Sequence, residues 1–199
     1  MQDFETSLEK MKTALVDFNV AEKETYGNFL AQTYFYVSHS TKLLALAAGL
    51  MKKEDEILFR RFIKHISEEA SHEVLAEKDL KDLEMNLQNF EHLASTRMLW
   101  ETQYCKIQHE DPAAFLGYIL ILEAFAAHAF PIFLQKIDHE YSSKAHRFVK
   151  VHAEEDPDHI EKAFELIGKL SDERKELIRV NMIQTADAYV NMLKSCAVH

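Results

Sequence analysis

The segment on which the fold depends reads AAFLGYILILEAFAAHAFPIFL and covers residues 113–134. It is almost wholly apolar, with Glu123 as its only formal charge, and it is long enough to cross a bilayer. We interpret it instead as a helix buried on all sides at the centre of a bundle, because the segments around it are amphipathic and need a shared core. Asp111 and Pro112 suit the start of this helix, and Pro131 is expected to kink or end it.

The segments on both sides of this helix carry apolar residues at helical spacing. Only 4 Gly and 3 Pro occur in the 199 residues, which disfavours a turn-rich all-β fold. The sequence therefore predicts an all-α fold: a single-domain helical bundle of seven to eight helices over residues 1–199. The other helices are expected at residues 2–16, 22–51, 54–84, 86–108, 142–155, 158–169 and 172–197.

Composition narrows the class of protein. Hydrophobic residues make up 47% of the chain and charged residues 28%, as in an ordinary globular protein. The net charge of −10 argues against binding to nucleic acid. Cys105 and Cys196 form neither a metal-type spacing nor a disulfide framework, and the N-terminus lacks the features of a signal peptide. We therefore expect a cytoplasmic protein with no membrane partner.

Two similar motifs carry the chemistry. His65–His72 reads HISEEASH and His152–His159 reads HAEEDPDH, and each has a carboxylate four residues and a second His seven residues after the first His. On one continuous helix these three positions share a face, since each residue turns the helix by ~100°. Chance placement of 11 His and 33 acidic residues predicts roughly 0.1 such triplets, whereas the chain has two.

The two motifs and the buried carboxylate of the central helix together predict a metal site. Its candidate ligands are His65, Glu69, His72, Glu123, His152, Asp156 and His159. These are too many ligands for one tetrahedral zinc, and no Cys joins them. Mixed nitrogen and oxygen ligands on facing helices are typical of dinuclear iron or manganese carboxylate sites, and iron with open positions would activate O2.

Three stretches carry a resemblance to a known family: residues 34–39 (YFYVSH), 62–73 (FIKHISEEASHE) and 79–83 (DLKDL). They resemble the haem-oxygenase-like fold of the TenA/PQQ-synthase superfamily, and within it the haem-oxygenase-like diiron oxidases. The resemblance implies iron as cofactor, two ions in number, with manganese or zinc as substitutes. It also implies O2 and a small fatty-acid-like or amino-acid-like substrate as partners, and a possible homodimer. The ligands that it implies are His65, His72, Glu123, His152, Asp156 and His159.

The chain departs from the family pattern at two positions. His65 stands where the family usually has Glu, and Glu69 could supply the missing carboxylate from the same face. Pro157 lies inside the second motif and removes a helical hydrogen bond. The first ligands to test are therefore His72, Glu123, His152, Asp156 and His159, followed by Glu69 and His65. Aromatic residues of segment 22–51, with Phe115, Phe125 and Phe130, are expected to line a substrate cavity.

Other functions within the superfamily make different demands. A TenA-type thiaminase acting on a pyrimidine would need a nucleophilic Cys, for which Cys105 is the candidate, although a small core residue is the more ordinary role for it. A haem oxygenase would need a His in the first helix, and the first His here is His39. Cofactor-free PQQ synthases use a pocket rich in His, Arg and Tyr, whereas we expect few Arg near this site. A binding or regulatory protein without turnover is the third possibility.

Overall fold

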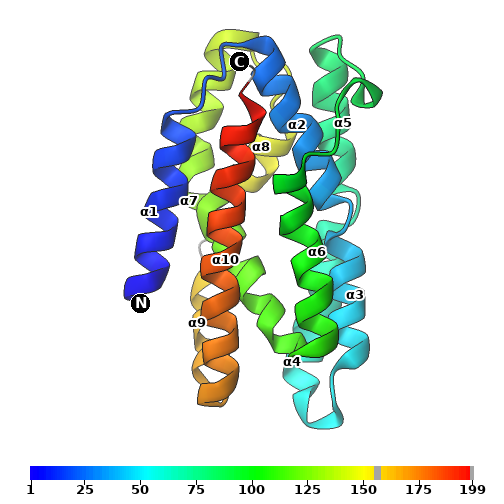
Figure 1. Cartoon of the computed structure of the whole chain (residues 1–199), viewed down its shortest axis with the longest axis vertical. Helices are drawn as coiled ribbons and strands as arrows, with labels where there is room; N and C mark the ends of the chain where they lie inside the picture. The colour runs from blue at the N-terminus through cyan, green and yellow to red at the C-terminus, as the bar shows by residue number, and fades with distance from the viewer. Residues whose placement is uncertain (155–157, 198–199) are drawn as a thin grey trace.

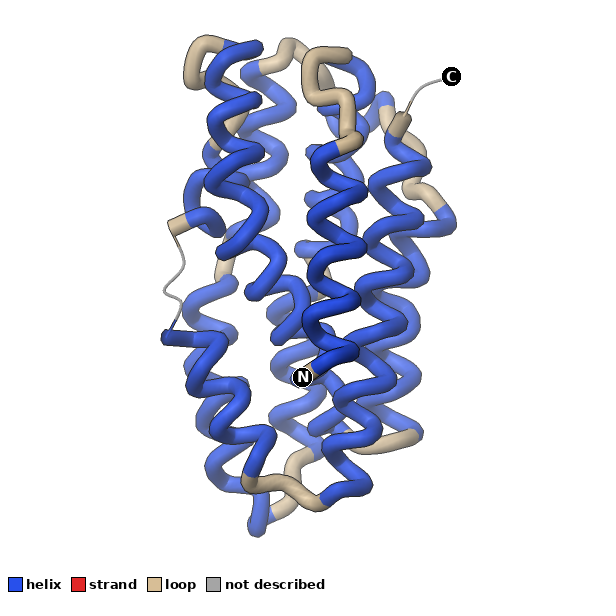
Figure 2. Tube along the Cα trace, turned by 90° about the vertical axis from the view of Figure 1, so that its left-hand side faces the viewer, coloured by secondary structure: helices blue, strands red, loops and turns tan. Residues whose placement is uncertain are grey.

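The computed structural model describes residues 1–154 and 158–197, with the side chains of residues 158 and 159 excepted. These residues form helices, turns and loops and contain no strand. The α-helices are α1 (Gln2–Val16), α2 (Lys23–Val37), α3 (Ser40–Leu50), α4 (Glu56–Glu69), α5 (His72–Asp82), α6 (Ala94–His109), α7 (Phe115–Tyr141), α8 (Arg147–Ala153), α9 (Asp158–Gly168) and α10 (Asp172–Cys196). Three 3₁₀ turns lie at Lys53–Asp55, Leu87–Asn89 and Pro112–Ala114. Most helices run along the long axis of the molecule (Figure 2).

Helix α7 is the central helix that residues 113–134 predict. It packs against α1, α8 and α10, and α1 and α10 lie side by side along it (Figure 1). The 3₁₀ turn Pro112–Ala114 leads into it and begins at the expected signal, because the Asp111 side chain accepts a hydrogen bond from the amide of Ala113 at 2.8 Å. Pro131 does not end the helix, which continues to Tyr141. Within the described residues, Pro112–Tyr141 is the one stretch long and apolar enough to cross a membrane, and 83% of its most apolar window is buried.

Gly117 allows α7 and α10 to approach each other closely. A Cβ atom at this position would overlap the carbonyl oxygen of Ile178 and lie 2.8 Å from the amide nitrogen of Met182. Both atoms belong to the backbone of α10 and cannot turn aside as a flexible side chain would. The contact between these two helices therefore requires glycine at this position.

Two of the expected long helices are broken. Segment 22–51 forms α2 and α3, separated at Ser38 and His39, and segment 54–84 forms α4 and α5, separated at Ala70 and Ser71. Ala70 is extended, and Ser71 adopts a left-handed conformation with φ 73°. Neither break is marked by Gly or Pro, which explains why apolar spacing alone predicts continuous helices. Counting each broken pair as one kinked helix, the described residues contain eight helices, as the sequence predicts.

The remaining boundaries differ less from expectation. Helix α6 begins at Ala94, where the Gln32 side chain accepts hydrogen bonds from the Leu93 amide and the Thr96 hydroxyl. Helix α8 begins at Arg147, later than the expected residue 142. Ser171 caps α10 as predicted, because its hydroxyl accepts a hydrogen bond from the amide of Arg174 at 3.4 Å.

Candidate metal centre

The break between α4 and α5 creates the first part of the site. Glu69 is the last residue of α4 and His72 is the first residue of α5, so the left-handed turn at Ser71 sets the angle between them. His152 approaches from α8, which packs against both α5 and α7. The sequence predicts that His65, Glu69 and His72 share one face of a continuous helix. This prediction is wrong, because α4 ends at Glu69 and His72 belongs to α5. The left-handed turn brings His72 beside Glu69 instead.

Glu69, His72 and His152 form a group that fits a metal ion. One ligand atom from each residue lies within 4.8 Å of the other two. The rings of His72 and His152 have centroids 4.8 Å apart, and His72 Nδ1 lies 3.6 Å from Glu69 Oε2. Two donor atoms that are each about 2.0–2.2 Å from one ion lie at most about 4.4 Å from each other, which is close to the separations seen here. Small side-chain rotations would close the group around an ion.

Hydrogen bonding at the two imidazoles also fits this interpretation. His152 Nδ1 donates to the backbone carbonyl of Phe148 at 2.8 Å, which fixes the ring and leaves Nε2 in the unprotonated form that binds metals. His72 Nδ1 is buried without a hydrogen-bond partner among the described residues. An unsatisfied buried polar atom costs about 1–3 kcal/mol. A metal ion would remove that cost.

The ionisation of these residues favours metal binding. Burial lowers the pKa of His65 and His152 below the usual value, although Glu69 opposes this. Burial alone would raise the pKa of the Glu69 carboxyl, but His72, His65 and His152 outweigh it and the pKa lies below the usual value. At neutral pH His152 therefore offers a neutral imidazole and Glu69 an ionised carboxylate, which are the forms that bind metals.

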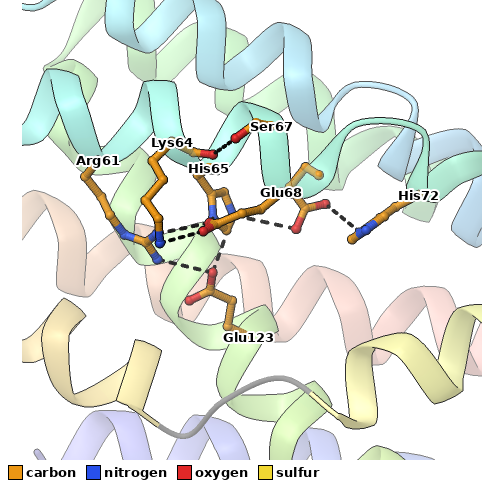
Figure 3. A network of polar contacts seen from close by, with 8 residues as sticks. Arg61, Lys64, His65, Ser67, Glu68, His72 and Glu123 are labelled. Atoms are coloured by element: carbon orange, nitrogen blue, oxygen red, sulfur yellow. Dashed lines mark hydrogen bonds and ion pairs between the residues drawn. The ribbon is translucent and has the colours of Figure 1, made fainter.

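A second group of side chains adjoins the first (Figure 3). His65 Nε2 lies 3.4 Å from Glu123 Oε1 and His65 Nδ1 lies 3.2 Å from Glu68 Oε2. Arg61 Nη2 lies 3.5 Å from the same oxygen of Glu123, and Arg61 Nη1 lies 3.4 Å from Glu68 Oε2. Lys64 pairs with the other oxygen of Glu68 at 2.7 Å. This network, which we call the Arg61 network, comprises Arg61, Lys64, His65, Glu68 and Glu123.

Glu123 is the least satisfied member of the Arg61 network. Its Oε2 atom is buried and has no hydrogen-bond partner within the described part of the chain. Burial raises the pKa of its carboxyl to about 7, although the Arg61 guanidinium acts in the opposite direction. The two groups are linked, since His65 Nε2 also lies 3.6 Å from Glu69 Oε1.

An apolar cavity opens beside both groups. Its volume is about 70 Å³. Its polar wall contains His65, Glu69, Glu123 and His152. Of the expected aromatic residues, Phe115, Phe125 and Phe130 of α7 line the wall, but segment 22–51 contributes Tyr36 and none of its other aromatic side chains. The cavity therefore joins an apolar interior to the candidate ligands.

Several predicted or alternative residues lie elsewhere. Asp156 and the side chain of His159 fall outside the described residues. Cys105, expected as a small core residue, is exposed on α6 and is not in the cavity wall. Cys196, by contrast, is buried near the end of α10. His39 stacks on Trp100, with ring centroids 3.9 Å apart.

Sequence reasoning missed Arg61 and Glu68. The expectation that few Arg lie near the site overlooked Arg61, which contacts two of its carboxylates. The signal was present, because Arg61 precedes His65 by four residues and Glu68 follows it by three, positions that share a face of α4.

Comparison with known proteins places this geometry in a family. One similar solved structure is a domain of unknown function with a haem oxygenase-like fold from Shewanella denitrificans, with a TM-score of 0.81 and 20% identity over 97% of this chain and 86% of that one. A TenA homologue from Pseudomonas syringae pv. tomato has a TM-score of 0.75 and 14% identity over 98% of this chain and 91% of that one. A TenA homologue from Pyrococcus furiosus has a TM-score of 0.70 and 16% identity over 98% of this chain and 100% of that one. They confirm the predicted all-α, haem-oxygenase-like fold. No curated protein matches the chain. The family profile described as "iron-containing redox enzyme" matches residues 27–192. The chain therefore belongs to this family of iron-containing redox enzymes with a haem-oxygenase-like fold.

Proposed function

We propose that this chain is an iron-dependent oxidoreductase that uses O2 to oxidise a small organic molecule bound in the apolar cavity. The observation that carries the proposal is the convergence of Glu69, His72 and His152, two of which, Glu69 and His152, line the cavity. Two imidazoles and one carboxylate are the ligand set of many non-haem iron oxygenases. Membership of the iron-containing family supports iron over manganese or zinc.

Each part of the site has a role in this proposal. Glu69, His72 and His152 would hold the ion, and iron bound there would pass to O2 the electrons that the organic substrate loses. The aromatic walls bind the apolar part of the substrate and exclude water. Glu123 lines the same cavity, and its Oε2 atom, which has no hydrogen-bond partner among the described residues, could accept a hydrogen bond from a polar group of the substrate. This lining suits a fatty-acid-like or amino-acid-like molecule with one polar end.

Anaerobic reconstitution with Fe(II), followed by exposure to O2, tests the proposal. We expect the wild-type chain to retain about one tightly bound iron or more, and a change in its absorption spectrum with O2. His152→Ala should lose both. His139→Ala is the matched control, since this residue is 83% exposed at its side chain and lies near the end of α7. A wild-type chain that retains no iron after reconstitution would rule out the proposal.

The alternatives predict different results. Iron binding without any response to O2 would favour a binding or regulatory protein. Thiaminase activity lost in Cys105→Ala would favour the TenA-type reaction, but no contact in the structure favours it, since Cys105 is exposed away from the cavity. A cytoplasmic location and a homodimer remain predictions from the sequence.

A further inference from the structure

Two candidate metal positions lie side by side, but one of them already contains a cation of the protein. The atoms that would hold a second ion are His65 Nε2 and Glu123 Oε1, which lie 3.4 Å apart. Arg61 Nη2 lies 3.5 Å from that same Glu123 oxygen, and its Nη1 lies 3.4 Å from Glu68 Oε2. A guanidinium is charged at every physiological pH. An ion bound at Glu123 Oε1 would have to displace this charge or lie beside it.

The guanidinium is held in place by its surroundings. The Arg61 side chain is only 19% exposed and spans two carboxylates, Glu68 and Glu123. Buried carboxylates need a compensating positive charge, which a metal or a protein cation can provide. Within the described part of the chain, Glu69 makes no ion pair with Lys or Arg and lies between two His side chains instead. At the first position, the described residues therefore contain no guanidinium or ammonium group that a bound ion would have to displace.

We propose that the Arg61 guanidinium occupies the place of a second metal ion, so that this chain binds a single ion, at Glu69, His72 and His152. This inference rests on the proposed function for the first ion. It departs from the two ions that the resemblance implies. It also offers a reason why His65 stands where the family usually has Glu. The neutral His65 imidazole would pack beside the Arg61 guanidinium and would not bind a metal ion.

The competing explanation is that Arg61 orients Glu123 as a ligand for a second ion. The two explanations predict opposite effects of removing the guanidinium. If Arg61 replaces an ion, its removal opens a second position. If Arg61 supports a ligand, its removal weakens metal binding.

The experiment is an anaerobic titration of the full chain with Fe(II), with bound metal measured by equilibrium dialysis. We expect about one ion per chain in the wild type and about two in Arg61→Met. Arg60→Met is the matched control, since this neighbouring Arg makes an exposed pair with Glu56 on the same helix, and it should bind as the wild type does. Adding Glu123→Gln to Arg61→Met should return the stoichiometry to about one.

Circular dichroism establishes that each variant is folded, and Arg61→Gln replaces Arg61→Met if the latter does not fold. Two ions in the wild type, or an unchanged or reduced number in the folded Arg61 variant, would overturn the inference while leaving the proposed function intact. No bound iron in the wild type would instead reject the proposed function together with this inference.

Discussion

The two neighbouring groups at the centre of this molecule use the same residue types in different electrostatic settings. In the first group, Glu69 with His72 and His152, these two imidazoles and that of the neighbouring His65 lower the pKa of the Glu69 carboxyl, although burial raises it. The Arg61 network contains a guanidinium, yet burial still raises the pKa of Glu123 to about 7. Residue identity alone therefore does not define a metal site. The source of positive charge around each carboxylate distinguishes the two groups.

Replacing the carboxylate of each group in turn should produce the largest difference between them. Glu69→Gln removes a proposed ligand. Losing a residue that only hydrogen-bonds to a ligand weakens metal affinity by about 10- to 100-fold, and we expect a larger loss of affinity for the first ion in Glu69→Gln. Glu123→Gln should leave this affinity unchanged within the error of the titration. Calorimetric titration with Mn(II) measures both. Equal losses in the two variants would show that the groups form one indivisible site.

A third pair of residues shows what an arginine does when it neutralises a carboxylate well. Arg174 contacts both oxygens of Asp55, at 2.5 and 3.1 Å, and this hydrogen bonding lowers the pKa of the Asp55 carboxyl despite its burial. The Arg61–Glu123 contact is longer and single. Asp55→Asn should therefore reduce the free energy of unfolding at pH 7 by about 1.5–3 kcal/mol.

The sign of the pH dependence follows from the lowered pKa. Asp55 is ionised more readily in the folded than in the unfolded chain. Its contribution to the free energy of unfolding is therefore fully present above the ordinary pKa of 3.8, and it is lost as the pH falls through the lower pKa of the folded state. Urea unfolding at several pH values should show wild type and Asp55→Asn converging below pH 3.8. A constant difference down to the lowest pH would contradict this assignment.

The sequence predicts the fold better than the site, for physical reasons. The apolar run around Glu123 and the capping residues Asp111 and Ser171 act locally, and the structure agrees with them. The motif containing His65 and His72 assumes a continuous helix. The left-handed turn at Ser71 depends on tertiary packing and has no Gly or Pro to mark it, so spacing could not reveal it.

Arg61 was missed for a related reason. A basic residue one turn before a candidate ligand is usually solvated on a helix surface. Its contact with Glu123 joins α4 to α7, and no local pattern encodes the distance between these two helices. The candidate ligands could therefore be named from the sequence, whereas the contact between Arg61 and Glu123 could not.

The smallest expected effect concerns the two helix breaks, each of which contains a serine. Ser71 has φ 73°, a conformation that costs non-glycine residues about 1–2 kcal/mol, whereas Ser38 has φ −59° and its hydroxyl donates to the carbonyl of Phe35 at 2.9 Å. Ser71→Gly should raise the free energy of unfolding of the metal-free chain by about 0.5–1 kcal/mol, and Ser38→Gly should lower it by a similar amount. Urea denaturation measures both changes, and metal affinity should persist in Ser71→Gly because glycine preserves the turn that joins Glu69 to His72. If both substitutions destabilise the chain equally, the turn at Ser71 is not the strained element that sets the angle between these two ligands.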